Sequence, residues 1–119
     1  MKKTVVVGAG PESYRYGHRA VVSLMRNGID VVPVGLHKGE INGQEIHTEF
    51  IDVPDVHTVT IYVHPRHQNY WKDYILSLKP KRAIFNPGAE NPEMIEAFQA
   101  AGITCQESCT LVMLSVGTY

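Results

Sequence analysis

Short apolar runs alternate with amphipathic segments along the whole chain. Five runs rich in valine, isoleucine and threonine have the length and composition of β-strands, at about 4–8, 30–34, 58–63, 82–86 and 103–106. Between them, apolar residues recur every three or four positions, which predicts helices at about 17–27, from Pro65, from Pro92 and at about 108–115. Strands separated by helices predict a parallel sheet that is covered on both faces.

Individual residues refine these elements. Asn91 is a good N-cap for the third helix. Pro33 cannot donate to a strand ladder, so the strand at 30–34 is expected to have an unpaired side near its end. The nearly continuous apolar run at 58–63 suits the middle of a parallel sheet. The long stretch 35–57 has no clear periodicity, and connections of this length usually carry a function or short unrecognised elements.

We therefore predict an α/β fold: a single Rossmann-like domain over residues 1–119, with a five-stranded parallel sheet in the order 3-2-1-4-5. In such a sheet the ligand lies beyond the carboxyl ends of the strands, at the point where the strand order reverses. That point falls beside the first strand. The segments expected to line the crevice are Gly8–Tyr16, Gly35–Gly39, His64–Gln68, Asn86–Asn91 and Glu107–Cys109.

The first strand runs into the glycine turn Gly8-Ala9-Gly10. Gly8 allows a sharp turn, and Gly10 lets a bulky anionic group approach the backbone. The helix that follows points its unpaired N–H groups and the positive end of its dipole toward that anion. The pattern indicates a nucleotide-phosphate site. The third glycine of the full dinucleotide fingerprint is replaced by Ser13, and a two-glycine turn alone also occurs in ordinary helix-capping loops.

The end of the second strand bears on which nucleotide is bound. A domain that binds NAD holds the ribose with an acidic residue there. Asp30 lies at the other end of this strand, whereas His37 and Lys38 follow it and suit an additional phosphate. This favours NADP or coenzyme A over NAD, with a solvated loop lysine as the alternative for Lys38. No Walker sequence is present, which argues against P-loop nucleotide hydrolysis.

Composition excludes several classes of protein. The 119 residues are 44% hydrophobic and 19% charged with a net charge of −1, so no basic excess attracts nucleic acid or a membrane surface. The apolar run after Lys3 is shorter than the about 7–15 residues of a signal peptide. No stretch approaches the roughly 18 apolar residues of a membrane span. Two cysteines, Cys105 and Cys109, make neither a disulfide framework nor a zinc site. We expect a cytoplasmic protein.

Six stretches together resemble a known family: TVVVGAG, SYRYGHRAV, VVPVGLHKGEINGQEI, VHTVTIYVHPRHQ, IFNPGAEN and GITCQESCTLVML. The chain resembles the small stand-alone CoA-binding domain proteins, which are similar to the N-terminal domain of the succinyl-CoA synthetase alpha subunit. The resemblance covers essentially the whole chain, and its most specific parts are NPGAEN at 86–91 and ESCTLVML at 107–114. The synthetase carries its phosphorylated histidine in a second domain, so its ligase chemistry is not implied.

The resemblance implies which residues contact coenzyme A. The turn from Gly8 to Ser13 would hold the pyrophosphate, and Lys38 would meet the ribose phosphate. Gly35-Leu36 stands where the family more often has Asn-Pro, which bears on the Lys38 contact. Val63 and Pro65 would line the path of the adenine and the pantetheine, with Asn86, Pro87 and Gly88 near its far end. The complete set of expected ligand contacts is Gly8, Ala9, Gly10, Pro11, Ser13, Tyr16, Lys38, Val63, Pro65, Asn86, Pro87 and Gly88.

Other residues near the predicted crevice have alternative interpretations. His64 and His67 have a spacing that suits two metal ligands, but no third donor is implied nearby. Tyr14 and Tyr16 suit stacking on adenine, or packing over the first helix. No nucleophile–base pair can be named.

Two classes of function remain. The first is a non-catalytic module that binds coenzyme A or an acyl-CoA, and the second is a small NADP-linked or other nucleotide-dependent enzyme. The second class needs a hydride-acceptor site, for which one domain offers few walls, so binding is favoured. A small-molecule nucleotide is the expected partner, and a homodimer or a protein partner is left open.

Overall fold

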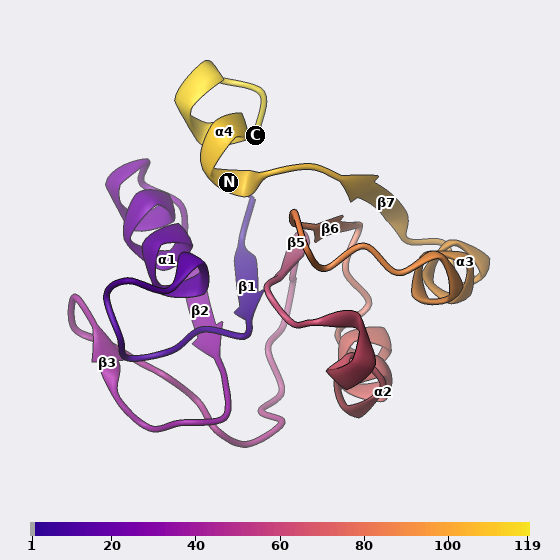
Figure 1. The fold of residues 1–119 in the computed structure, drawn as a ribbon, viewed down its shortest axis with the longest axis horizontal. Helices are drawn as coiled ribbons and strands as arrows, with labels where there is room; N and C mark the ends of the chain where they lie inside the picture. Colours follow the sequence, from indigo (N-terminus) through magenta and orange to yellow (C-terminus); the bar gives the residue numbers. More distant parts are fainter. Residues whose placement is uncertain (1) are drawn as a thin grey trace.

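The computed structural model describes residues 2–119, and a five-stranded parallel sheet forms its centre (Figure 1). The strands are β1 (Thr4–Val7), β2 (Val31–Val34), β5 (Thr58–Ile61), β6 (Arg82–Phe85) and β7 (Thr104–Glu107). The helices are α1 (Tyr16–Arg26), η1 (Pro65–His67, a 3₁₀ turn), α2 (Asn69–Leu78), α3 (Pro92–Ala100) and α4 (Thr110–Val116). The predicted α/β fold class is confirmed.

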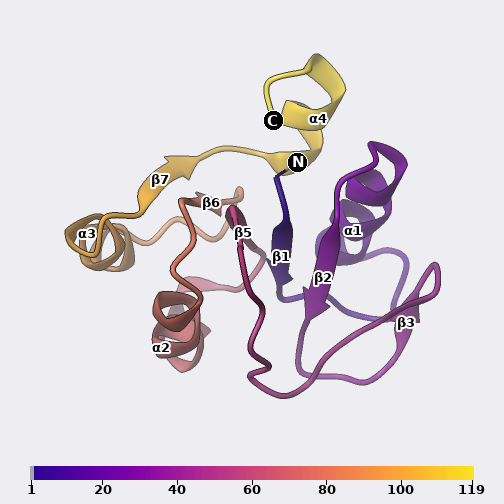
Figure 2. The same ribbon diagram turned by 180° about the vertical axis from the view of Figure 1, so that it is seen from behind.

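The two faces of the sheet are covered by different helices. Figures 1 and 2 show α1 and α4 on one side, and α2 and α3 on the other. Successive side chains of β1 point to opposite faces. Val6 packs in the cluster that contains Leu24 of α1, whereas Val5 packs in the larger cluster that contains Trp71 of α2 and Phe98 of α3. Both faces of the central strands are therefore buried.

The order of the strands is β2-β1-β5-β6-β7, which corrects the predicted order in one place. Counted along the chain this is 2-1-3-4-5, because β5 pairs with β1 rather than lying beyond β2. The physical reason lies in Pro33. The carbonyl of Pro33 points away from β1 and accepts a hydrogen bond from His47 N (3.0 Å). The proline nitrogen, which has no hydrogen to donate, points the same way, so this side of β2 suits the edge of the sheet. The strand order reverses between β1 and β5, where a ligand site is expected.

The segment 35–57 contains a short hairpin that the periodicity did not predict. Its strands are β3 (Glu40–Ile41) and β4 (Gln44–Glu45), which pair antiparallel. The turn between them has positive φ at both Asn42 (48°) and Gly43 (86°), as a two-residue hairpin turn of type I′ requires. The hairpin brings Ile41 and Ile46 into the apolar cluster beneath α1.

Candidate functional site

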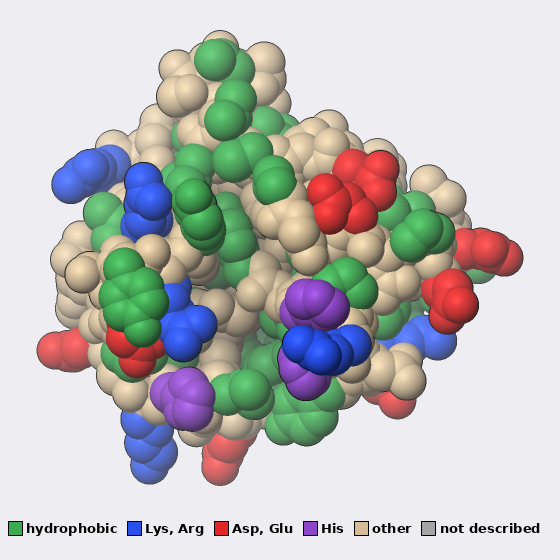
Figure 3. Space-filling model, viewed as in Figure 1, with side chains coloured by type: hydrophobic (Ala, Val, Ile, Leu, Met, Phe, Trp, Pro, Cys, Tyr) green, Lys and Arg blue, Asp and Glu red, His purple; other side chains and the backbone are tan. Residues whose placement is uncertain are grey.

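A cavity of about 610 Å³ lies at the carboxyl ends of β1, β5 and β6, at the point where the strand order reverses. Its walls are Gly8, the start of α1 (14–17), the segment after β5 (62–64), the turn after β6 (87–89), and Cys109 and Leu111 around the start of α4. Figure 3 shows that hydrophobic, basic and histidine side chains gather around the hollowed middle of one face of the molecule.

The turn between β1 and α1 depends on two glycines that approach other backbone closely. Gly8 has φ of 95°, and a Cβ on it would lie 2.5 Å from the carbonyl oxygen of Tyr62. A Cβ on Gly17 would lie 2.6 Å from the carbonyl oxygen of Gly8. In the dinucleotide fingerprint the third glycine permits close packing of helix against strand. Gly17 permits that close packing here, four residues beyond the Ser13 position of the fingerprint.

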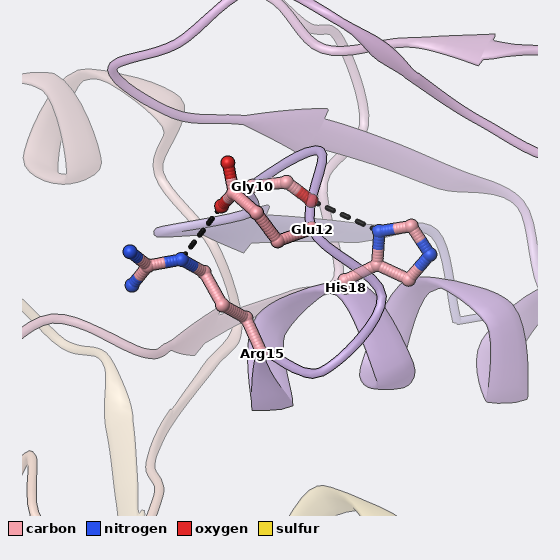
Figure 4. A network of polar contacts seen from close by, with 4 residues as sticks. All are labelled: Gly10, Glu12, Arg15 and His18. Atoms are coloured by element: carbon pink, nitrogen blue, oxygen red, sulfur yellow. Dashed lines mark hydrogen bonds and ion pairs between the residues drawn. The ribbon is translucent and has the colours of Figure 1, made fainter.

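Arg15, the residue before α1, lines the cavity, and Figure 4 shows the polar contacts that Arg15 and His18 make with the turn after β1. The N-cap residue Arg15 makes no side-chain cap, and the first turn has no acidic residue, so the positive end of the helix is open to an anion. Arg15 Nε donates to Glu12 Oε1 (2.7 Å), and this hydrogen bond raises the pKa of Arg15. His18 Nδ1 donates to the carbonyl oxygen of Gly10 (3.0 Å), which anchors the turn on the helix.

The segment after β5 supplies one apolar and one polar wall. Burial raises the pKa of Tyr62, so its phenol stays neutral beside Val63. His64 Nδ1 accepts a hydrogen bond from Arg66 N (3.2 Å). In a neutral imidazole the other ring nitrogen must then carry the proton. His64 therefore offers a hydrogen-bond donor at the wall of the cavity.

Asn86, an expected ligand contact, is buried, and its side chain links three elements at this edge of the sheet by hydrogen bonds. Its Nδ2 donates to Thr60 Oγ1 (2.6 Å) and to the carbonyl oxygen of Ile61 (3.0 Å). Its Oδ1 accepts from Thr110 N (2.9 Å), at the first residue of α4. The side chain thus ties β6 to β5 and to the start of α4, while the next two residues, 87–88, line the cavity.

The structure gathers part of the predicted contact set at the cavity. The expected residues that line it are Gly8, Tyr16, Val63, Pro87 and Gly88. Those that do not line it are Ala9, Gly10, Pro11 and Ser13 in the turn, Pro65 in η1, the buried Asn86, and Lys38 on the exposed loop after β2. Sequence reasoning missed Gly17, Tyr62 and Leu111, whereas Ala89 lies in the segment Asn86–Asn91 that was expected to line the crevice. Tyr62 could have been predicted, because it lies near the carboxyl end of the central strand expected at 58–63.

Among the described residues, no third side chain joins His64 and His67 to complete a metal site. Their ring centroids lie 6.4 Å apart. Within residues 2–119, no three His, Cys, Asp or Glu side chains are grouped so that they could hold a metal ion. Both cysteines are free thiols. Over the same described residues, no helix has the length and apolar character needed to cross a membrane.

Comparison with known proteins gives one family and several related folds. The family model described as "CoA binding domain" matches residues 2–115. A crystal structure of a protein described as uncharacterized has 49% sequence identity and a TM-score of 0.97, and the match covers 100% of this chain and 98% of that one. A hypothetical protein from Pyrococcus horikoshii OT3 has 24% identity and a TM-score of 0.87, with 97% and 82% of the two chains covered.

A third solved structure, from Thermus thermophilus, has 23% identity and a TM-score of 0.85, with 99% and 91% of the two chains covered. At that identity, as for the Pyrococcus protein, the likeness shows the fold alone. No match was found among curated proteins.

Proposed function

Because the chain belongs to the family of CoA binding domains, we propose that it binds coenzyme A or an acyl-CoA in the cavity at the carboxyl ends of β1, β5 and β6, without catalysing a reaction on it. The observation that carries this proposal is the position of the cavity. It adjoins the uncapped start of α1 at the reversal of strand order, where open α/β sheets hold phosphorylated ligands.

The pyrophosphate of the ligand would lie at the start of α1, on the turn Gly8-Ala9-Gly10, of which Gly8 lines the cavity. The backbone N–H groups of the first turn have no side-chain acceptor, and Arg15 adds a guanidinium beside them. Charge-assisted hydrogen bonds of this kind are roughly twice as strong as neutral ones. A pyrophosphate would compete with the Glu12 carboxylate for Arg15, since an ion pair exposed to solvent is weak.

The pantetheine arm would run across the remaining walls of the cavity. Val63, Pro87 and Leu111 give these walls apolar surface, and His64 offers a donor for an amide carbonyl. The volume of about 610 Å³ falls within the range of roughly 300–1,000 Å³ that small-molecule sites occupy.

One observation supports binding over catalysis. Cys109 supplies a thiol at the cavity, and within residues 2–119 that thiol has no hydrogen bond to a base that could activate it. The second strand ends without the acidic residue that holds the ribose of NAD, which argues against NAD as the ligand.

Thermal denaturation with separate additions of coenzyme A, acetyl-CoA, NADP and NAD tests the proposal. A ligand that binds only the folded state at 100 times its Kd stabilises it by about 2.7 kcal/mol. That corresponds to a rise in Tm of the order of 10 °C for a domain of this size. We expect this rise with coenzyme A and none with NAD. A rise with NADP and none with coenzyme A would overturn the proposal in favour of the nucleotide-dependent enzyme.

A further inference from the structure

The two outer strands of the sheet, β2 and β7, differ in how their free sides are protected. Beside β2, His47 N donates to the carbonyl oxygen of Pro33 (3.0 Å), and Gly35 N donates to the carbonyl oxygen of His47 (2.9 Å). Pro33 itself has no hydrogen to donate. β7 forms the opposite edge (Figure 1), contains no proline, lysine or arginine, and pairs on one side alone within residues 2–119. An edge strand without such protection pairs readily with another chain.

The ladder with β6 determines which groups of β7 face outward. Thr104 N donates to the carbonyl oxygen of Lys81 (3.1 Å), and Ser108 N likewise donates to the end of β6 (3.2 Å). Every second residue from 104 therefore directs its backbone groups toward β6, and the residues between direct theirs away from the sheet. Those residues are Cys105 and Glu107. Within residues 2–119 their backbone N–H groups have no hydrogen-bond acceptor.

This pattern of free groups matches itself. When two copies of β7 run antiparallel with Cys105 opposite Glu107 of the second copy, both outward residues of both copies are used, and each such pair exchanges two backbone hydrogen bonds. Glu107 is the only charged side chain in the segment 101–119. In this register it lies opposite an uncharged thiol, whose pKa burial raises, rather than opposite the second Glu107.

The same register places Gln106 on the twofold axis, opposite Gln106 of the second copy. Gln106 is half-buried, and its Oε1 is buried without a hydrogen-bond partner within residues 2–119. A buried amide oxygen without a donor costs free energy. The two glutamines form a close pair whose side chains lie on one face of the sheet, so the Nε2 of one copy can donate to the Oε1 of the other.

We propose that β7 binds β7 of a second copy of this chain across a twofold axis at Gln106, so that the two five-stranded sheets continue into each other. A second copy is the occupant because its β7 supplies both the matching backbone groups and a donor for the unpaired glutamine oxygen. An interface of this kind is isologous and closes as a dimer. The inference is independent of the proposed function, since residues 104–107 do not line the cavity.

Sedimentation equilibrium over a range of protein concentrations tests whether the dimer forms. Because two short strands bury less surface than a standard interface, we expect a Kd of the order of 100 μM for the natural protein. Gln106→Lys places two ammonium groups opposite each other on the axis and should weaken association by about tenfold. Gln99→Lys makes the same change at an exposed position of α3 and should leave association unchanged. Circular dichroism checks that each variant is folded.

Disulfide formation tests the register. In a Cys105→Ser/Cys109→Ser background, Gln106→Cys should link two copies on oxidation, because Cα atoms directly opposite each other lie about 4.5–5.5 Å apart, within the reach of a disulfide. Thr104→Cys in the same background should not, because the two copies of that residue lie about 13 Å apart along the strands.

Three results would overturn the inference: a natural protein that is monomeric up to about ten times the expected Kd, association that Gln106→Lys leaves unchanged, or cross-linking of the Gln106→Cys variant that does not exceed that of the Thr104→Cys variant. A monomeric natural protein would leave the edge of β7 to an extended segment of a different protein.

Discussion

The two edges of the parallel sheet are built differently. At the amino ends of the strands, side chains close the edge. Arg82 donates through Nε to Thr58 Oγ1 (2.9 Å) and through Nη1 to the carbonyl oxygen of Tyr119 (3.1 Å), and its guanidinium lies 4.4 Å from the centroid of the Tyr119 ring. The Tyr119 hydroxyl in turn lies 2.5 Å from Thr4 Oγ1. Tyr119 thus contacts the starts of β1 and β6, and Arg82 links the start of β6 to that of β5.

At the carboxyl ends, backbone contacts and one buried amide take the place of this network. Gly8 and Gly17 bring β1, β5 and α1 together with no side chain between them, and Asn86 fixes the start of α4. The N–H groups at the start of α1 and the hydrophobic walls of the cavity are left available. Side chains therefore close the amino edge, whereas the carboxyl edge, in the proposed function, combines stability with binding. Four substitutions test that division.

Gly8→Ala should have the largest effect, on stability. The new methyl group would lie 2.5 Å from a backbone oxygen, and the residue would keep a φ of 95° that L-amino acids avoid. We expect a loss of about 3–4 kcal/mol in the free energy of unfolding, measured by urea denaturation. Gly43→Ala is the matched control, since Gly43 also has a positive φ but open space around it, and it should lose only about 1 kcal/mol. Equal losses would show that the close approach at Gly8 contributes nothing.

Asn86→Ala should have the next largest effect. It removes three hydrogen bonds of a buried side chain and leaves Thr110 N without its acceptor. We expect a loss of about 2–3 kcal/mol in the free energy of unfolding. Hydrogen exchange should show early opening of α4. Loss of coenzyme A binding with unchanged stability would contradict the structural role of Asn86 and restore it as a ligand contact.

Gly10→Val should separate binding from folding within the same turn. Gly10 is not among the residues with positive φ, and its Cβ would meet the flexible side chains of Arg15 (3.1 Å) and Glu12 (3.3 Å). The fold should therefore tolerate the change. Because the valine would block the approach of a pyrophosphate, affinity for coenzyme A should fall at least tenfold, or about 1.4 kcal/mol. Calorimetry that shows unchanged affinity would remove the pyrophosphate from this turn.

The smallest effect belongs to the amino edge and depends on pH. Burial, and then the nearby Arg82 and Lys2, lower the pKa of His57. The unfolded chain then binds the proton more tightly, so stability is complete above the unfolded pKa of about 6.5 and decreases as the pH falls below it. His57→Gln should flatten this decrease in urea midpoints at pH 7.5, 6.5 and 5.5, whereas His37→Gln on an exposed loop should not. The same slope in the His57 variant would contradict the assignment.

Two local sequence signals indicated the correct positions of strands that the predicted strand order misplaced. Pro33 indicated an edge strand, and the apolar run at 58–63 indicated a central one; both features hold for β2 and β5. Together they contradict the order 3-2-1-4-5, which places the third strand at the edge and the second inside. The pair Asn42-Gly43 was also a hairpin signal, since both positions readily take positive φ.

The site was harder to predict than the fold, because it depends on where side chains point. The sequence located the edge of the sheet and the glycine turn, but Asn86 turns inward to bond Thr60 and Thr110. Gly17 takes part through a backbone approach, which is a tertiary feature that no local motif records.

Amide hydrogen exchange with and without coenzyme A tests most directly whether the ligand binds at the carboxyl edge. We expect ligand-dependent protection in segments 8–17, 62–64, 86–89 and 109–111, and none in the segments that begin the strands near Thr4, Thr58 and Arg82. Protection confined to the amino edge, or no protection at saturating coenzyme A, would contradict binding at the carboxyl edge.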